Sequence, residues 1–505
     1  RKKPTTMQQQ QQQRPPSMAA ATTILDETNT SFANIPPMPP PPGQAPNQND
    51  TDALFADELN KLSLKERDEV LYDVHGVADV VVETPDMIEN AVQQMAYVLQ
   101  QIPVEEKHAY GIALSQDSNY VTDRKLWTMF LRADHFRPQQ AAVRLVAFFQ
   151  MKYELFPIEA LARDVKLSDL DDDDLRTLES GYAQIGNQRD RAGRAIFLLM
   201  PTIKKNKTYE NKLRAIYLVL MFAMRDEETQ KRGVVGIPYN VGRDHTKDRE
   251  AVWKAAKLVS ILPVRFTGIH YCFSDEKVQL LFSLAMFVFN KNARIRCRLH
   301  MGTHMECIYK LMTFGIPGDA IPVAHSGGKK LEAHIEFMQM MRKFEALPPN
   351  GHDNVNHIIL PGKYDVLLGR GKPLQKHTGN LNYHCVVESY HEEYERALKL
   401  EKTKLAAKIV EQIHNQGGRF LKQDDFGSWV EIDEEAARTK ISHTFRNHRI
   451  AARTALKKEQ QQQQQKQQQA SVAAAFGSVF PSSASNEFFG SSLGGRFSPG
   501  MVLDP

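Results

Sequence analysis

Three groups of residues have types and spacings that could do chemistry. His300, His304 and Cys307 are spaced as metal ligands can be, but no fourth ligand accompanies them, so we predict no metal site. Ser326 follows a histidine, but it is not the centre of the G-x-S-x-G elbow that serine hydrolases use. A third group, the 369–372 loop, has glycines and basic residues but not the Walker A spacing for a nucleotide. We therefore predict a protein that is not an enzyme and has no cofactor.

The composition sets broad limits on the class of protein. The 505 residues are 42% hydrophobic and 25% charged, which excludes a fibrous or wholly disordered chain. The net charge of +4 is too small to indicate nucleic-acid binding by bulk charge. Four cysteines without a C-x-x-C pair favour a reducing compartment, so we expect a cytoplasmic protein, and a nuclear location stays open.

Shifts in composition predict where the folded units begin and end. Both ends are low in complexity, with proline and glutamine runs at one end and glutamine, serine and glycine at the other. Such segments bury too little apolar surface to offset their ordering entropy, so we expect them to be disordered. The predicted units are a disordered 1–51, a helical subdomain 52–165, an α/β domain 166–345, a linker 346–362, an α+β domain 363–455 and a disordered tail 456–505.

The middle of the chain alternates between strand-like and helix-like patterns. Short apolar runs at 195–200, 233–237 and 267–272 predict strands, and the period-two segment 294–300 predicts a fourth. Helical patterns separate them, which favours crossover connections and a largely parallel sheet. In the N-terminal part, helices are expected near 85–98, 125–131 and 139–153; in the middle, at 211–224 and 249–262.

The segment 275–289 leaves almost no polar face if it is helical. A helix that is apolar all round is either buried in a core or faces another apolar phase. It is too short to span a bilayer, so a bound lipid or a membrane surface is the alternative to a core position. Periodicity alone leaves both interpretations open.

Several motifs from 120 to 328 resemble the CRAL-TRIO family, which includes retinaldehyde- and tocopherol-binding proteins and phosphatidylinositol transfer proteins. The segment 131–136 is similar to the family's L-R-A-x-x-F motif, and 190–194 to its D-x-x-G-R motif. Leu262-Pro263-Val264-Arg265 and the closing Ile316-Pro317, Ile321-Pro322 and Gly327-Gly328 follow in the family's order. One departure is Asn240, close to the place where the family generally has an aspartate before its glycine.

The resemblance implies an α/β lipid-binding domain with a helical N-terminal subdomain, in which a mobile gate helix covers an apolar cavity. The segment 275–289 matches the gate position. The ligand would be a hydrophobic lipid or a phospholipid. The protein would exchange it through transient peripheral contact with membranes and would not modify it chemically. The pocket and gate residues expected from the resemblance are Val235, Ile269, Tyr271, Leu281, Phe282, Ala285, Met286 and Phe289. Arg294, Arg296 and Arg298, which alternate along one strand, are candidate contacts to a lipid headgroup because guanidinium groups suit phosphate oxygens.

The unit from about 363 to 455 resembles an uncharacterised domain family of algal, diatom-type proteins. The resemblance rests on D-V-L-L-G-R-G at 365–371, H-x-G-N at 377–380 and G-G-R-F-L at 417–421. The predicted elements are helices at 382–398, 402–415 and 434–449, and a hairpin formed by 419–421 and 428–432. Arg370, Lys372 and Arg446 are its candidate anion or partner contacts. Protein partners are expected here, and nucleic acid is the less favoured partner.

Two functions remain open from the sequence. The first is a lipid-binding or lipid-transfer protein with an appended interaction module. The alternative is a nuclear regulator whose C-terminal domain binds nucleic acid or protein, with the lipid fold as a sensor.

Overall fold

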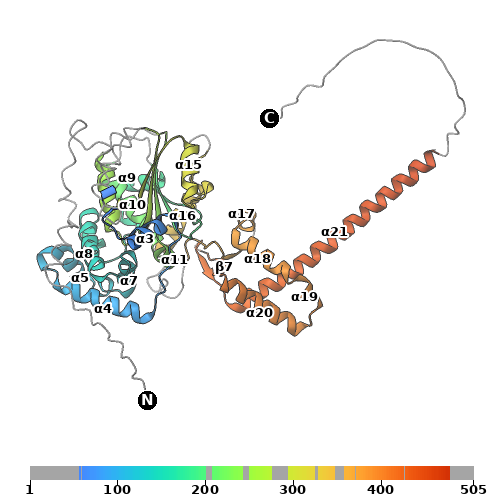
Figure 1. Cartoon of the computed structure of the whole chain (residues 1–505), viewed down its shortest axis with the longest axis horizontal. Helices are drawn as coiled ribbons and strands as arrows, with labels where there is room; N and C mark the ends of the chain where they lie inside the picture. The colour runs from blue at the N-terminus through green and yellow to red at the C-terminus, as the bar shows by residue number, and fades with distance from the viewer. Residues whose placement is uncertain are drawn as a thin grey trace, which may run out of the picture.

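The computed structural model shows a mixed α/β protein that is mostly helical and has two small sheets (Figure 1). The residues described are 56–57, 60–200, 208–242, 249–275, 294–324, 328–346, 358–369, 371–425 and 427–477. At 249–252, 372–373 and 470–477 the description covers the backbone alone. Among the helices in these ranges, none has both the length and the apolar character that crossing a bilayer requires.

Most helices of the N-terminal part surround one long, buried helix, α8 (Pro138–Leu155). They are α4 (Pro85–Gln101), α5 (His108–Gln116), α6 (Ser118–Val121) and α7 (Arg124–Ala133). The first helix, α3 (Leu64–His75), packs instead against β4 (Phe266–Phe273), and its Val70 and Val74 share a small cluster with Ile295. Pro138 occupies the first turn of α8, where its missing N–H costs nothing, and Phe148 and Phe149 are fully buried. The helices predicted near 85–98, 125–131 and 139–153 are confirmed.

The larger sheet has five strands in the order β1-β2-β3-β4-β5. β1 pairs antiparallel with β2, and the other pairs are parallel. The strands are β1 (Ala183–Ile185), β2 (Ala195–Leu199), β3 (Val234–Asn240), β4 (Phe266–Phe273) and β5 (Cys297–Met301). The associated helices are α9 (Asp172–Glu179), α10 (Tyr209–Ala223), α11 (Glu227–Arg232), α12 (Arg249–Ile261), α15 (His304–Thr313) and α16 (Glu332–Glu345). The parallel strands confirm the prediction of a largely parallel sheet.

Each face of this sheet is buried in its own hydrophobic cluster. Phe197, Ile269 and Tyr271 belong to the large cluster that includes α8, α10 and α12. Ile196 and Val235 belong to a second cluster that includes residues of α15 and the segment that follows it. Because successive side chains of a strand point to opposite faces, neighbouring residues of β2, β3 and β4 are divided between the two clusters.

The segment 190–194 forms a turn that joins three parts of the α/β unit. The Asp190 carboxylate accepts hydrogen bonds from the backbone N–H groups of Ala192 and Arg194 and pairs with the Arg194 guanidinium at 2.6 Å. The guanidinium also donates to backbone carbonyls of α3 and to the carbonyl of Phe314 after α15. The D-x-x-G-R motif therefore has a structural role here, because its charged groups bind one another and the backbone.

The end of the predicted linker is buried rather than solvated. The N–H and C=O groups of Ile358 exchange hydrogen bonds with Trp429, at 2.8 and 2.9 Å. Two residues later, the Leu360 carbonyl accepts hydrogen bonds from Arg189, whose guanidinium pairs with Asp226 at 2.7 Å. Both charged side chains are 2% exposed. The predicted linker 346–362 is thus corrected: its last residues connect the two folded units through buried contacts.

The C-terminal unit has a three-stranded sheet in the order β6-β7-β8, with β6 and β7 parallel and β7 and β8 antiparallel. The strands are β6 (Val366–Leu368), β7 (Phe420–Gln423) and β8 (Trp429–Glu431). The helices are α17 (Lys372–Gln375), α18 (Thr378–Ser389), α19 (His391–Arg396), α20 (Lys399–Asn415) and α21 (Glu434–Gly477). The predicted hairpin is confirmed.

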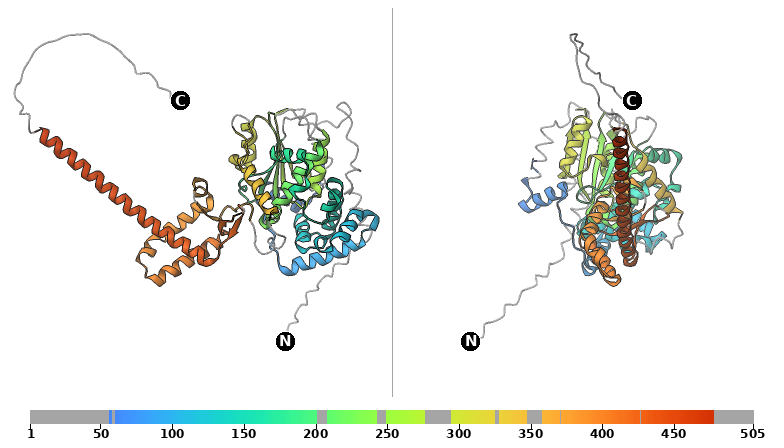
Figure 2. Two further views of the ribbon diagram at one scale, coloured as in Figure 1. Left: turned by 180° about the vertical axis from the view of Figure 1, so that it is seen from behind. Right: turned by 90° about the vertical axis from the view of Figure 1, so that its right-hand side faces the viewer.

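Two helix predictions in this unit are corrected. The helix expected at 382–398 is two helices, α18 and α19, which are separated at Tyr390. The last helix, expected to end near 449, continues to Gly477 and projects away from the α/β unit in the left view of Figure 2. The predicted tail 456–505 is therefore helical as far as 477.

The glycines of the C-terminal motifs allow close approaches of the backbone. A Cβ atom on Gly379 would lie 2.0 Å from the Asp365 carbonyl oxygen, and one on Gly418 would lie 2.3 Å from the Tyr364 carbonyl oxygen. Asn380 bonds both backbone groups of Leu367. The Asp365 carboxylate accepts from the backbone and guanidinium of Arg419. These motif residues hold β6 against α18 and β7.

We expect Arg189→Met to destabilise the protein by about 3–5 kcal/mol, because it leaves Asp226 buried without its cation. The measurement is urea unfolding. Arg225→Met is the matched control: its pair with Asp164 is partly exposed, so the loss should stay below about 1 kcal/mol. Equal losses in the two variants would contradict the role assigned to the buried pair.

We expect Gly379→Ala to cost at least about 3 kcal/mol, because the added methyl group would overlap a backbone carbonyl that cannot rotate away. Gly111→Ala in α5 is the control, because a Cβ added there would meet no atom of another element within 4 Å among the described residues. This substitution should stabilise the helix by about 0.5–1 kcal/mol. Thermal unfolding of both variants tests this; an unchanged Gly379→Ala protein would refute the close approach.

Candidate functional site

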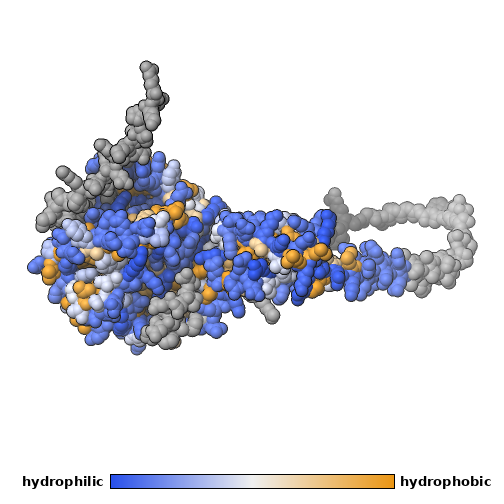
Figure 3. All heavy atoms as spheres, turned by 90° about the horizontal axis from the view of Figure 1, so that it is seen from below, coloured by the Kyte–Doolittle hydropathy of each residue, from blue (hydrophilic) through white to orange (hydrophobic). Residues whose placement is uncertain are grey.

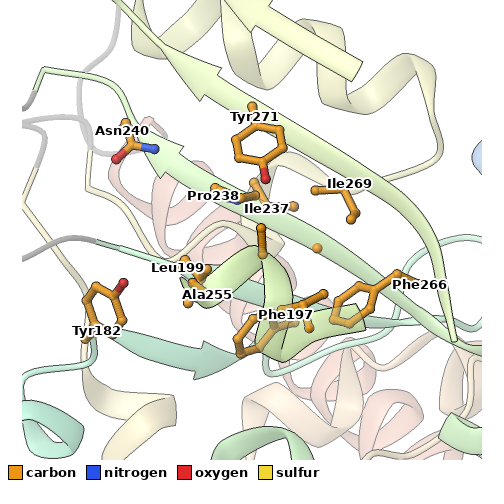
Figure 4. A pocket seen from close by; sticks show the side chains of 13 residues that line it. Tyr182, Phe197, Leu199, Ile237, Pro238, Asn240, Ala255, Phe266, Ile269 and Tyr271 are labelled. Carbon is orange, nitrogen blue, oxygen red and sulfur yellow. The ribbon is translucent and has the colours of Figure 1, made fainter. Parts of the chain in front are cut away.

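A cavity of about 70 Å³ lies between the larger sheet and α12 (Figure 4). Its lining comes from the β1 region, the middle of β2, β3 and β4, and one side of α12. The lining residues are Tyr182, Phe197, Leu199, Gly236, Ile237, Pro238, Asn240, Ala255, Ala256, Val259, Phe266, Ile269 and Tyr271. The cavity therefore lies on the sheet face that belongs to the large hydrophobic cluster.

Local features of β3 and β4 leave room for the cavity. Gly236 presents no side chain, and a Cβ atom there would lie 3.2 Å from the Phe266 ring. The register between β3 and β4 shifts at Val234 and Val235, so Phe266 and Ile269 both reach the lining although they are three residues apart. A small residue at this central position and an irregular register together keep the space open.

The lining is apolar apart from an amide and two phenols. In the described part of the chain it contains no carboxylate, imidazole, ammonium or guanidinium group. Burial raises the pKa of Tyr182 and Tyr271, so both phenols are neutral at physiological pH. Asn240 lies at one end of the cavity, and its side chain is also uncharged (Figure 4). A neutral, apolar guest fits this chemistry, and a small anion does not.

The predicted pocket residues have three different outcomes. Ile269 and Tyr271 line the cavity. Val235 lies in the cluster on the opposite face of the sheet, because it alternates with Gly236 along β3. Its assignment to the pocket is corrected by this geometry. Five predicted gate residues lie outside the described residues: Leu281, Phe282, Ala285, Met286 and Phe289.

Most of the lining was not identified from the sequence. Phe197 and Phe266 are large rings on the pocket face of β2 and β4, and α12 contributes Ala255, Ala256 and Val259. The alternation along β2 could have identified Phe197, since Ile196 and Leu198 flank it on the other face. The side of α12 that faces the sheet required a tertiary structure, because its apolar residues are not confined to one stripe.

The three arginines predicted to contact a headgroup have different surroundings in the fold. Arg296 forms an ion pair of 2.7 Å with Asp73 of α3, and its side chain is 12% exposed. Arg298 donates to the carbonyls of Ile295 and Cys297. Arg294 is half-buried. The expectation of one basic face open to phosphate does not fit Arg296, whose charge is already compensated within the fold.

The candidate anion contacts of the C-terminal unit are described only in part. Arg446 is exposed on α21. Arg370 lies outside the described residues, and of Lys372 only the backbone in α17 is described.

The histidines of β4 and β5 form a buried stack behind the cavity. Nδ1 of His270 and Nε2 of His300 are 2.9 Å apart, and the two rings are parallel within 8°. Burial lowers the pKa of His300 to about 4, and the nearby Lys310 and Arg298 act in the same direction. The pKa of His270 is also well below its usual value, first through burial and then through His300. Both imidazoles are therefore neutral at pH 7.

The other two residues with metal-like spacing have partners of their own. Nδ1 of His304 is hydrogen-bonded to the Tyr239 hydroxyl, and the Cys307 thiol approaches the His300 carbonyl oxygen at 3.5 Å. Each side chain thus contacts a different partner.

Acid should weaken the fold through His300. The unfolded chain binds a proton near pH 6.5 and the folded chain only near pH 4, so stability falls as the pH drops from 6.5 to 4, by about 3 kcal/mol from this group. His300→Gln should flatten this part of the curve, measured by urea unfolding at several pH values. His443→Gln, at an exposed site, should retain the slope of the native protein. The same slope in both variants would contradict the assignment.

The chain gives no match among curated proteins. One similar solved structure, described as the crystal structure of Sfh5, is 11% identical with a TM-score of 0.30, and the match covers 51% of this chain and 98% of that one. Residues 365–447 match the family model of a domain of unknown function, DUF6824.

Proposed function

We propose that the protein binds one apolar lipid between its larger sheet and α12 and exchanges or presents that lipid at membranes. The observation that carries this proposal is the cavity lining, in which strand and helix side chains are apolar and the polar groups are neutral. The sequence motifs that resemble the CRAL-TRIO family support the same function. We also propose that residues from about 120 to 330 have a CRAL-TRIO-like fold.

Hydrophobic transfer supplies the binding energy. Each CH₂ group that leaves water contributes about 0.8 kcal/mol, so a chain of about ten methylene groups reaches micromolar affinity before entropic costs are counted. The cavity of about 70 Å³ is roughly twice the volume that one water molecule occupies in the liquid. A lipid chain is larger than this, so binding requires the lining elements to separate, with Asn240 and the two phenols available to orient a polar end.

We propose as the gate the apolar segment 275–289, which follows β4 in the sequence and includes Phe282 and Met286. All of it after residue 275 lies outside the described residues, so the assignment rests on the sequence. A helix with almost no polar face can exchange contacts with a bound lipid for contacts with a bilayer.

Filling the cavity from α12 tests the proposal. Val259→Phe places a ring at the lining, so the variant should carry at least about tenfold less co-purified lipid and transfer labelled lipid between vesicles correspondingly slowly. Mass spectrometry of the organic extract identifies the bound lipid, and fluorescence dequenching measures transfer.

Leu258→Phe is the matched control for this variant. Leu258 is the preceding residue of the same helix, is fully buried, and is not part of the lining. Both variants overpack the interior at a cost of about 1–3 kcal/mol, but only the first should lose lipid. If native protein purified from its own cells carries no lipid, or if both variants lose it equally, the proposed function is refuted.

A further inference from the structure

Three metal-binding side chains converge in the C-terminal unit, far along the chain from the cavity. The donor atoms of Glu388, His391 and His448 all lie within 4.8 Å of one another. They come from three helices, since Glu388 is on α18, His391 begins α19 and His448 is on α21. The cluster therefore lies where these three helices meet.

One of the three side chains has a buried ring nitrogen without a partner. Nδ1 of His391 is buried and has no hydrogen-bond partner in the described part of the chain. Nδ1 of His448 lies 3.3 Å from the Glu388 carboxylate. The contact between Glu388 and His448 accounts for those two groups but not for the buried nitrogen of His391. A cation that all three bind would account for all of them.

The surrounding contacts fix the backbone positions of the donors. The Tyr394 and Phe445 rings stack with centroids 3.8 Å apart, which holds α19 against α21. The Tyr383 hydroxyl is hydrogen-bonded to Thr444 at 2.7 Å, which holds α18 against α21. A site built on packed helices is more precise than one on loops, because the packing fixes the backbone positions of its ligands.

We propose that Glu388, His391 and His448 bind one divalent transition-metal ion of the zinc class. Two imidazoles and a carboxylate are a known zinc ligand set, with ligand distances near 2.0–2.2 Å, whereas magnesium prefers oxygen ligands alone. His384, which is not one of the three clustered side chains, is the candidate for the fourth ligand. It lies one helical turn before Glu388 on α18, is exposed, and its ring centre is 6.1 Å from that of His448.

The bound ion would fasten the base of α21 to α18 and α19. Metal binding to the folded form alone stabilises that form, so zinc should raise the unfolding temperature of the C-terminal unit. This role is independent of lipid binding and is tested separately from it.

The test uses the full chain without a histidine tag, titrated with zinc chloride by calorimetry and analysed for bound metal after dialysis. We expect one zinc ion per chain, no competition from magnesium, and visible absorption of the cobalt(II) form typical of four ligands. His391→Ala and His448→Ala should each lower the zinc affinity by at least about 100-fold, more than the loss of an outer partner of a ligand. His384→Ala should have a smaller effect.

His443→Ala is the matched control, since His443 is an exposed histidine on α21 outside the cluster. Its affinity should equal that of the native protein. Glu388→Gln provides a variant at a largely exposed side chain, in case the histidine variants fold poorly, and circular dichroism checks each one. The proposal is overturned if zinc does not bind saturably, or if Glu388→Gln and the folded histidine variants bind zinc as tightly as the native protein does.

Discussion

The larger sheet is buried on both faces, and most of the α/β unit follows from that constraint. A strand with two buried faces sends alternate side chains into two separate cores. On one face, Gly236 leaves a gap that Phe197, Phe266 and α12 surround. On the other face, the same strands contribute the stacked pair of His270 and His300. A shift of one residue in β4 would exchange Ile269 and Tyr271 of the cavity wall for His270 of the opposite face.

Buried polar contacts connect this sheet to the rest of the chain. Arg194 joins the start of β2 to α3 and to the end of α15, while Arg189 joins the turn before β2 to Leu360. From Leu360 it is two residues to Ile358, which pairs with Trp429 of β8. The C-terminal unit is therefore attached near the start of β2, and Lys343 of α16 adds a hydrogen bond to the Asp425 carbonyl between β7 and β8.

The sequence predicted the elements better than the site. The strands at 195–200, 233–237 and 267–272 and the helices around them were identified because their apolar runs have clear lengths and ends. The three-residue strands β1 and β6 were missed, since so short a segment has no measurable period. Val235 was assigned to the wrong face because alternation divides residues into two sets but does not tell which set meets the cavity. That choice depends on where the connecting helices pack.

Two charged pairs next to glycines have a structural role that their residue types alone do not reveal. Asp190 and Arg194, and Asp365 and Arg419, are charged pairs next to glycines, a combination that suggests an anion site. In both units the pair instead binds backbone groups and closes a turn. The cluster of Glu388, His391 and His448 could not be found from the sequence. Glu388 and His391 are three residues apart, but His448 approaches them only through the packing of α21.

The length of α21 has a mechanical consequence. All residues described from 451 to 469 are exposed, and much of the surface visible along this part of the molecule is hydrophilic (Figure 3). From 456 to 477 the helix extends about 33 Å at 1.5 Å per residue. A rod of this kind acts as a spacer, because it sets its own far end at Gly477 about 33 Å beyond residue 456.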